Sequence, residues 1–138
     1  MLYRNNYSVF ITGSKEENEI IKKELGYEIP NTYNLMGKFQ LEELIKFISC
    51  CDVLVAASTG PLHIAAALGI HAVGIYPPIK PMHPDRWKPI GVNVDVLCVN
   101  KDCEVCRRTN KCLCMQQITP EQVLDVILKT SERTGTML

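Results

Sequence analysis

A strand, a glycine turn and a helix follow one another directly in residues 53–69, and this succession constrains the fold more than any other feature. Residues 53–57 are apolar throughout, as expected of a parallel strand that is covered on both faces. Residues 60–68 have the composition of an alanine-rich helix, which Gly69 ends. A buried strand that passes at once into a helix predicts one unit of an α/β sheet.

The same alternation of strand and helix runs along the rest of the chain. Further strands are predicted at residues 7–12, 33–36, 72–76 and 94–99, the last at an edge of the sheet. Capping boxes predict helices that begin after Ser14, with Glu17, and after Thr119, with Gln122. Residues 41–48 carry apolar side chains at helical spacing. We therefore predict a single α/β domain over residues 1–138, with a Rossmann-like parallel sheet flanked by helices.

Charge and hydropathy exclude several classes of function. Lys and Arg total 15, as do Asp and Glu, so no net positive charge favours nucleic acid or anionic lipid. No segment is long and apolar enough to span a bilayer, and residues 1–7 lack the apolar stretch of a signal peptide. The expected compartment is the cytoplasm, where the 7 cysteines would stay reduced.

The turn between the strand at 53–57 and its helix has the chemistry of a diphosphate site. Parallel sheets bind ligands at the carboxyl ends of their strands, where a helix N-terminus presents free N–H groups. Ser58 and Thr59 add hydroxyl donors. Gly60 allows close approach to the backbone, and His63 is the only ionisable side chain in the helix. In the alternative interpretation, Ser58 or Thr59 only caps a core helix and His63 is a satisfied surface histidine.

Residues 58–69 read Ser-Thr-Gly-Pro-Leu-His-Ile-Ala-Ala-Ala-Leu-Gly, and this run closely resembles the donor-site motif of glycosyltransferase family nine, the heptosyltransferases. The resemblance continues upstream in residues 12–17 and 35–44. Downstream it continues in residues 74–78 and in the cysteine-rich segment that leads to residues 119–121. It covers residues 8–127 in all, and the order and spacing of the pieces make it specific.

The resemblance implies a GT-B architecture, in which two Rossmann-like domains hold the substrates between them and the C-terminal domain binds ADP-heptose. By their place in the motif, Thr59, Gly60 and His63 would hold the diphosphate. The family often has Asp where this chain has Ser58. That departure removes a carboxylate from the implied site and leaves the donor open.

Three residues outside this run also match the family pattern. Glu17 matches an acidic residue near the ribose, and Met36 and Gly37 match a strand end beside the adenine. Glu17 has a competing structural role, because it is the residue that completes the predicted capping box with Ser14.

The resemblance further implies an inverting, metal-independent transfer of heptose to a lipopolysaccharide core sugar, with peripheral association at the inner face of the inner membrane. The base that takes the acceptor's proton would be a carboxylate of the family's N-terminal domain, so neither a catalytic residue nor a cofactor is expected in this chain. We expect a fragment of a two-domain enzyme that is inactive alone. The alternatives are a non-catalytic nucleotide-binding module, a zinc-stabilised interaction domain and a sugar-nucleotide epimerase.

A long proline-rich segment, residues 76–91, follows the strand predicted at 72–76. Long ordered connections of this kind are often functional. Lys80, His83 and Arg86 could complement a diphosphate, and Trp87 could stack on a ring. The alternative is a stiff surface loop whose Trp87 side chain is inserted into the core.

Seven cysteines fall into two groups. Four of them have the spacing C-x2-C-x5-C-x-C: Cys103, Cys106, Cys112 and Cys114. Four thiolates suit tetrahedral zinc, but the second pair is closely spaced, so we expect reduced structural thiols and keep zinc as the alternative. The other three, Cys50, Cys51 and Cys98, are expected to be ordinary core residues.

Overall fold

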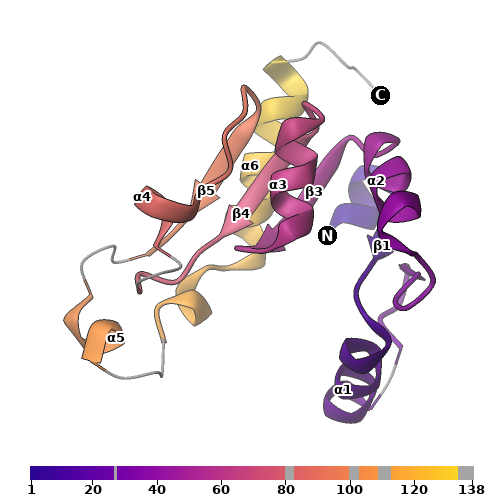
Figure 1. The fold of residues 1–138 in the computed structure, drawn as a ribbon, viewed down its shortest axis with the longest axis horizontal. Helices are drawn as coiled ribbons and strands as arrows, with labels where there is room; N and C mark the ends of the chain where they lie inside the picture. Colours follow the sequence, from indigo (N-terminus) through magenta and orange to yellow (C-terminus); the bar gives the residue numbers. More distant parts are fainter. Residues whose placement is uncertain (27, 80–82, 100–102, 109–112, 134–138) are drawn as a thin grey trace. The chain divides into compact units, whose positions relative to one another are not determined.

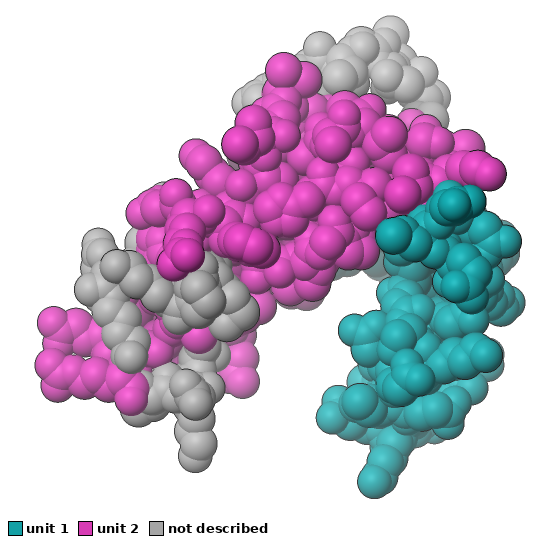
Figure 2. All heavy atoms as spheres, viewed as in Figure 1, with its two compact units in different colours: residues 1–44 teal, residues 45–138 magenta. Residues whose placement is uncertain are grey.

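The computed structural model describes residues 1–26, 28–79, 83–99, 103–108 and 113–133. The chain divides into two compact units, residues 1–44 and residues 45–138 (Figure 2). Among the described residues, the first unit holds a parallel sheet of two strands and the second a parallel sheet of three. The predicted α/β class is therefore confirmed, while the single domain over residues 1–138 remains a prediction.

The sheet of the second unit has the strand order β3, β4, β5. These strands are Val53–Ala57, His71–Ile75 and Val94–Leu97. The central strand β4 is buried over its first four residues, whereas β3 and β5 lie at the edges of this sheet and are partly exposed. The edge position of β5 was predicted correctly. The prediction that β3 is covered on both faces is wrong, because an edge strand has fewer neighbours, and Val55 is 39% exposed.

Two helices pack on this sheet. Helix α3, Gly60–Ala67, contacts β3 and β4, and helix α6, Pro120–Arg133, contacts β4. Figure 1 shows α3 and α6 on opposite faces of the sheet. Leu62 of α3 and Tyr76, which follows β4, are fully buried. Gly74 leaves room for both, since a Cβ there would lie 2.5 Å from Tyr76 Cε2 and 2.9 Å from Leu62 Cδ2.

The other elements of the second unit are short. They are α4 (Pro84–Trp87), α5 (Glu104–Arg108) and the 3-10 helix η2 (Met115–Gln117). The predicted capping box of α6 is present: Gln122 N–H donates to Thr119 Oγ1 at 3.3 Å, and Thr119 N–H donates to Gln122 Oε1 at 2.9 Å. At the start of β4, the buried His71 places Nε2 2.8 Å from Asp95 Oδ2 on β5, which ties the two strands together.

The first unit contains the 3-10 helix η1 (Leu2–Asn5), strand β1 (Phe10–Ile11), helix α1 (Lys15–Leu25) and strand β2 (Tyr33–Asn34). β1 and β2 pair in parallel and are shorter than predicted. The predicted capping box of α1 is confirmed, and the helix ends at Gly26, which adopts φ 69°. Within α1, whose residues are all described, none is buried, and Ile20 is 55% exposed. A sheet of two short strands offers α1 little surface to cover.

Helix α2, Leu41–Ser49, begins in residues 1–44 and continues into residues 45–138. Its predicted amphipathic character is confirmed in part, since Ile48 is 1% exposed but Leu41 is 64% exposed. Across the described part of the chain, no helix combines the length and the apolar character needed to cross a membrane.

Candidate functional site

The N-terminus of α3 is the first part of the predicted site. Thr59 is the N-cap residue, with extended backbone (φ −126°), and Pro61 occupies the first turn. Thr59 N–H donates to Ala57 O at 2.7 Å, which forms the tight turn out of β3. Within the described residues, the Thr59 hydroxyl makes no capping hydrogen bond to the helix. The alternative in which Thr59 serves only as a side-chain cap is therefore not supported, and its hydroxyl remains available to a ligand.

Gly60 opens this helix end to its surroundings. A Cβ added at Gly60 would meet no described heavy atom within 4 Å outside its own neighbourhood in the chain. Both Thr59 and Gly60 are exposed, and Ser58 is half-buried. Thr59 N–H and Leu62 N–H donate to Ala57 O and Thr59 O, which leaves the Gly60 N–H to meet a ligand. The helix dipole favours an anion at this end. The space next to Gly60 can therefore accept a charged group against the backbone.

His63 lies one turn further along α3 and is the least satisfied polar group of this region. Its Nε2 atom is buried, and no hydrogen-bond partner for it is found among the residues that the structure describes. No described residue satisfies this nitrogen in the way that the alternative, a satisfied surface histidine, requires. Buried polar atoms normally have partners, so this nitrogen is suited to a hydrogen bond with a ligand.

The proline-rich segment brings Trp87 to His63. The two rings have centroids 5.6 Å apart and planes at 75°, an edge-to-face arrangement. Tyr76 Oη donates to the Trp87 carbonyl at 3.0 Å, which fixes the end of α4, and burial raises the pKa of Tyr76. The side chain of Trp87 is 49% exposed, so its predicted alternative place in the core is wrong.

The basic residues of the proline-rich segment say less about the candidate site. His83 caps α4, because its Nδ1 accepts a hydrogen bond from the Asp85 N–H at 3.3 Å. Arg86 is exposed on α4. Lys80 lies outside the described residues. The prediction that these side chains complement a diphosphate stays a prediction.

Glu17, Met36 and Gly37 come together in the first unit, around Gly13. A Cβ on Gly13 would lie 2.7 Å from Met36 Cε and 2.8 Å from Glu17 Oε2, and Gly37 N–H donates to Gly13 O at 2.7 Å. Gly37 has φ +70°, and the Lys15 side chain lies where its Cβ would be. Met36 and Gly37 were predicted to lie beside a nucleobase. At this place Gly13 and Gly37, which have no side chains, let the neighbouring side chains pack closely.

Glu17 also performs the capping role that the sequence predicted. Its Oε2 accepts from Ser14 N–H at 2.7 Å, and its own N–H donates to Ser14 Oγ at 3.1 Å. The capping box is therefore complete. A ribose contact would have to use the remaining acceptor capacity of the same carboxylate.

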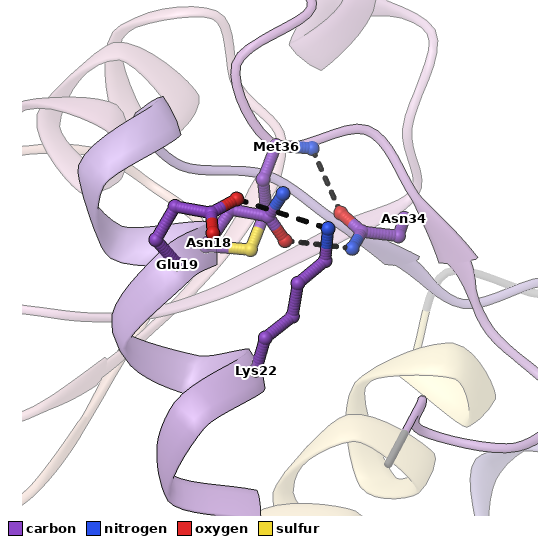
Figure 3. Close-up of polar contacts among 5 residues, drawn as sticks. All are labelled: Asn18, Glu19, Lys22, Asn34 and Met36. Atoms are coloured by element: carbon purple, nitrogen blue, oxygen red, sulfur yellow. Dashed lines mark hydrogen bonds and ion pairs between the residues drawn. The ribbon is translucent and has the colours of Figure 1, made fainter. Parts of the chain in front are cut away.

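A small pocket of about 90 Å³ lies between α1 and β2, and Figure 3 shows the polar side chains next to it. Asn34 Nδ2 donates to Asn18 Oδ1 at 2.9 Å, and Met36 N–H donates to Asn34 Oδ1 at 3.0 Å. Lys22 pairs with Glu19 at 3.8 Å. Ligand pockets usually measure about 300–1,000 Å³, so this cavity alone is too small for a nucleotide. The asparagine pair is better explained as support for the backbone at Met36.

Three of the four closely spaced cysteines lie together. The sulfur atoms of Cys103, Cys106 and Cys114 are all within 4.8 Å of one another, and Cys106 and Cys114 are each 4% exposed. Hydrogen bonds, first from the Cys106 N–H and then from the Cys106 and Cys114 thiols, hold the pKa of Cys103 below its usual range. Cys112 lies outside the described residues.

The other three cysteines do not form part of the core as predicted. Cys50 is exposed, and Cys51 and Cys98 are half-buried. Cys50 and Cys51 follow the last residue of helix α2, where the chain turns toward β3, and such a connection offers fewer neighbours than the middle of a helix. Burial raises the pKa of the Cys51 thiol, with smaller contributions from Cys50 and Asp52.

The predicted site residues thus form two groups. Ser58, Thr59, Gly60 and His63 lie together in the second unit, while Glu17, Met36 and Gly37 lie together in the first. Sequence reasoning missed two contributors to these groups, namely Lys15 and the Tyr76–Trp87 hydrogen bond. No local pattern predicts either of them, because each contact joins different elements.

A comparison with protein families finds that the family described as glycosyltransferase family 9 (heptosyltransferase) matches residues 1–116. The matched span includes all seven predicted site residues.

Individual relatives agree with this match. The chain is 30% identical over 134 residues to lipooligosaccharide heptosyltransferase 2 of Campylobacter jejuni subsp. jejuni serotype O:6, covering 89% of this chain and 40% of the relative. It is 28% identical over 132 residues to lipopolysaccharide heptosyltransferase 2 of Salmonella typhimurium, covering 90% and 37%. The chain therefore spans about two fifths of the length of these relatives.

Solved structures share the fold. An ADP-heptose lps heptosyltransferase II of E. coli matches with a TM-score of 0.77 and 23% identity, over 98% of this chain and 39% of that chain. A glycosyl transferase family 9 structure from Veillonella parvula matches with a TM-score of 0.70 and 22% identity, over 91% and 37%. The α/β arrangement is thus that of a segment of these larger proteins.

Proposed function

The chain belongs to glycosyltransferase family 9, and we propose that it forms the donor-binding part of a heptosyltransferase. The proposed donor is ADP-heptose or a related nucleotide sugar, and the proposed acceptor is a lipopolysaccharide core sugar. The heptosyltransferases named above support this proposal. The proposal is limited to donor binding, because the chain spans about two fifths of their length.

A single observation carries the proposal. The Nε2 atom of His63 in α3 is buried and has no hydrogen-bond partner among the residues that the structure describes. The Thr59 hydroxyl and the open space at Gly60 lie at the N-terminal end of the same helix. A diphosphate bound there would meet the Gly60 N–H and the positive end of the helix dipole. The Thr59 and Leu62 N–H groups already donate to Ala57 O and Thr59 O. The hydroxyl and the imidazole would add donors to the phosphate oxygens, and these would also stabilise the leaving diphosphate during transfer.

For the group around Gly13 in the first unit, the family resemblance supports contacts with a base and a ribose. The strand end at Met36 and Gly37 would border the adenine, and the free acceptor capacity of Glu17 would receive the ribose hydroxyls. Ser58 brings no negative charge to the diphosphate, so the choice of donor has to be measured with several nucleotides.

We assign acceptor binding and the base to other parts of the enzyme. The transfer needs a group that takes the acceptor's proton, and the proposed donor site does not include one. The chain alone is therefore expected to bind nucleotide without transferring sugar. The proposed place of action is the cytoplasm, with peripheral association at the inner face of the inner membrane.

An amide NMR titration of the 138-residue chain with ADP, UDP and GDP tests the proposal. We expect shifts at Thr59, Gly60 and His63 that favour ADP. A Thr59→Val/His63→Ala variant should lose them. Gly60→Ala is the sharper variant, since its Cβ meets no described atom and yet enters the proposed ligand space. A folded Gly60→Ala chain that binds ADP as well as the wild type would contradict the proposed site.

The alternatives make different predictions. A non-catalytic module would bind ADP but support no transfer after the rest of the enzyme is supplied. An interaction domain stabilised by zinc, or an epimerase, would not show ADP-selective shifts that depend on Thr59 and His63. The relatives are named as heptosyltransferases, so they do not favour these alternatives.

A further inference from the structure

A trio of cysteine sulfurs, Cys103, Cys106 and Cys114, converges in the second unit from both sides of α5. Cys103 directly precedes α5, Cys106 lies within it, and Cys114 directly precedes η2. All three sulfurs lie within 4.8 Å of one another, and the Cys106 and Cys114 sulfurs are 3.5 Å apart. The donor-binding proposal makes no use of this trio.

These distances suit a shared metal ion better than a disulfide. A zinc–sulfur bond of about 2.3 Å places two tetrahedral thiolates roughly 3.8 Å apart, close to the separation of Cys106 and Cys114. A disulfide requires about 2.05 Å between two sulfurs and would leave the third without a role. Small shifts of the side chains would therefore be enough to bring all three sulfurs onto one cation.

The chemical type of the metal-binding atoms indicates which cation would bind. Among the described residues, the group that could hold a metal consists of three cysteines, without a carboxylate or an imidazole. The nearby carboxylate of Glu104 is exposed and lies 3.3 Å from Arg108. Thiolate ligands suit zinc and exclude the hard cations magnesium and calcium.

We propose that Cys103, Cys106 and Cys114 form a structural zinc site that ties α5 to the start of η2. The three thiolates supply three positions of a tetrahedral site, and water or a further ligand takes the fourth. The zinc takes no part in the proposed transfer. It replaces part of the core that the short elements α5 and η2 do not provide by themselves.

The test uses the intact chain, purified under reducing conditions without chelator. Metal content is measured by mass spectrometry, and the metal-free chain is titrated with Co²⁺ while its absorption is recorded. We expect about one zinc per chain, as a single tetrahedral site requires, and a thiolate-to-cobalt charge-transfer band with the strong visible bands of tetrahedral cobalt. Cys103→Ser should lose both signals. Cys50→Ser, a change at an exposed cysteine outside the trio, should keep them.

Three results would overturn the proposal. The first is a folded, reduced wild-type chain that holds no zinc and gives no thiolate–cobalt band. The second is a Cys103→Ser variant that retains full zinc binding. The third is a Cys106–Cys114 disulfide, found by mass spectrometry of freshly purified, metal-free protein, because that would make the pair a redox couple. The wild-type measurements decide the matter even if a buried cysteine variant fails to fold.

Discussion

The imidazole of His63 and the indole of Trp87 meet edge to face, with ring centroids 5.6 Å apart. This contact joins α3, which carries the proposed diphosphate site, to α4 in the proline-rich segment. It places a half-exposed aromatic ring beside His63, whose Nε2 has no hydrogen-bond partner among the described residues. The position of Trp87 therefore makes it a reporter of whatever His63 binds.

Trp87 is the only tryptophan of the chain, so its fluorescence reports on this site alone. We expect ADP to change the emission of Trp87 and His63→Ala to abolish that change. Trp87→Ala removes the ring contact that positions His63, and an aromatic pair is worth about 0.5–1.5 kcal/mol, so ADP binding should weaken by no more than that. Trp87→Phe should weaken it less. Calorimetry of the two variants provides the measurement. If wild type and Trp87→Ala bind ADP with equal affinity, the contact between His63 and Trp87 plays no part in ADP binding.

The hydrogen bond from Tyr76 to the Trp87 carbonyl should contribute to stability. Tyr76→Phe removes a 3.0 Å bond from a fully buried phenol and is expected to cost about 1 kcal/mol in free energy of unfolding. Denaturant unfolding measures this cost. Tyr33→Phe is the matched control, because Tyr33 is 59% exposed and should change stability little. A control variant as destabilised as Tyr76→Phe would contradict the assignment.

Burial of the same phenol gives a pH dependence. The pKa of Tyr76 is raised above its ordinary value of 10.0, so the unfolded chain ionises this group at lower pH than the folded chain does. Its contribution to stability is fully present below about pH 10 and is lost as the pH rises through the folded pKa. Tyr76→Phe should therefore lose less stability than the wild type between neutral and strongly alkaline pH. If the stabilities of wild type and Tyr76→Phe fall equally with rising pH, the Tyr76 phenol is not kept un-ionised by burial.

Gly74 is expected to tolerate no side chain. Gly74→Ala would place a Cβ 2.5 Å from the Tyr76 ring and 2.9 Å from Leu62, and overpacking of this kind costs about 1–3 kcal/mol. Thermal or denaturant unfolding would show the loss. Gly60→Ala serves as the control for stability, since its Cβ meets no described atom. A Gly74→Ala chain as stable as Gly60→Ala would mean that Tyr76 and Leu62 can move apart.

Two substitutions separate the two roles of Glu17. Glu17→Gln keeps a capping-box acceptor, whereas Glu17→Ala removes the bond to Ser14 N–H and should cost about 1 kcal/mol. If Glu17 also receives the ribose, Glu17→Gln should weaken ADP binding while leaving unfolding unchanged. Paired unfolding curves and ADP titrations measure both effects. Unchanged ADP affinity in Glu17→Gln would leave capping as its role.

Much of the local structure could be predicted from the sequence. The capping boxes at Ser14 and Thr119 and the succession of β3, turn and α3 all agree with the structure. These features depend on residues a few positions apart, whose hydrogen bonds and periodicity are visible in the sequence. Burial was less predictable. Ile20 of α1 and Cys50 are exposed, because burial depends on which other elements cover them.

The sequence by itself determined the α/β class, the helix ends and the candidate donors at residues 58–63, since each follows from short-range chemistry. Only the tertiary structure decided that Trp87 faces His63, that Tyr76 and Leu62 fill the space left by Gly74, and that three cysteine sulfurs converge. Those relationships join residues on different elements. Their distances depend on how helices and loops pack on the sheet, which no local pattern encodes.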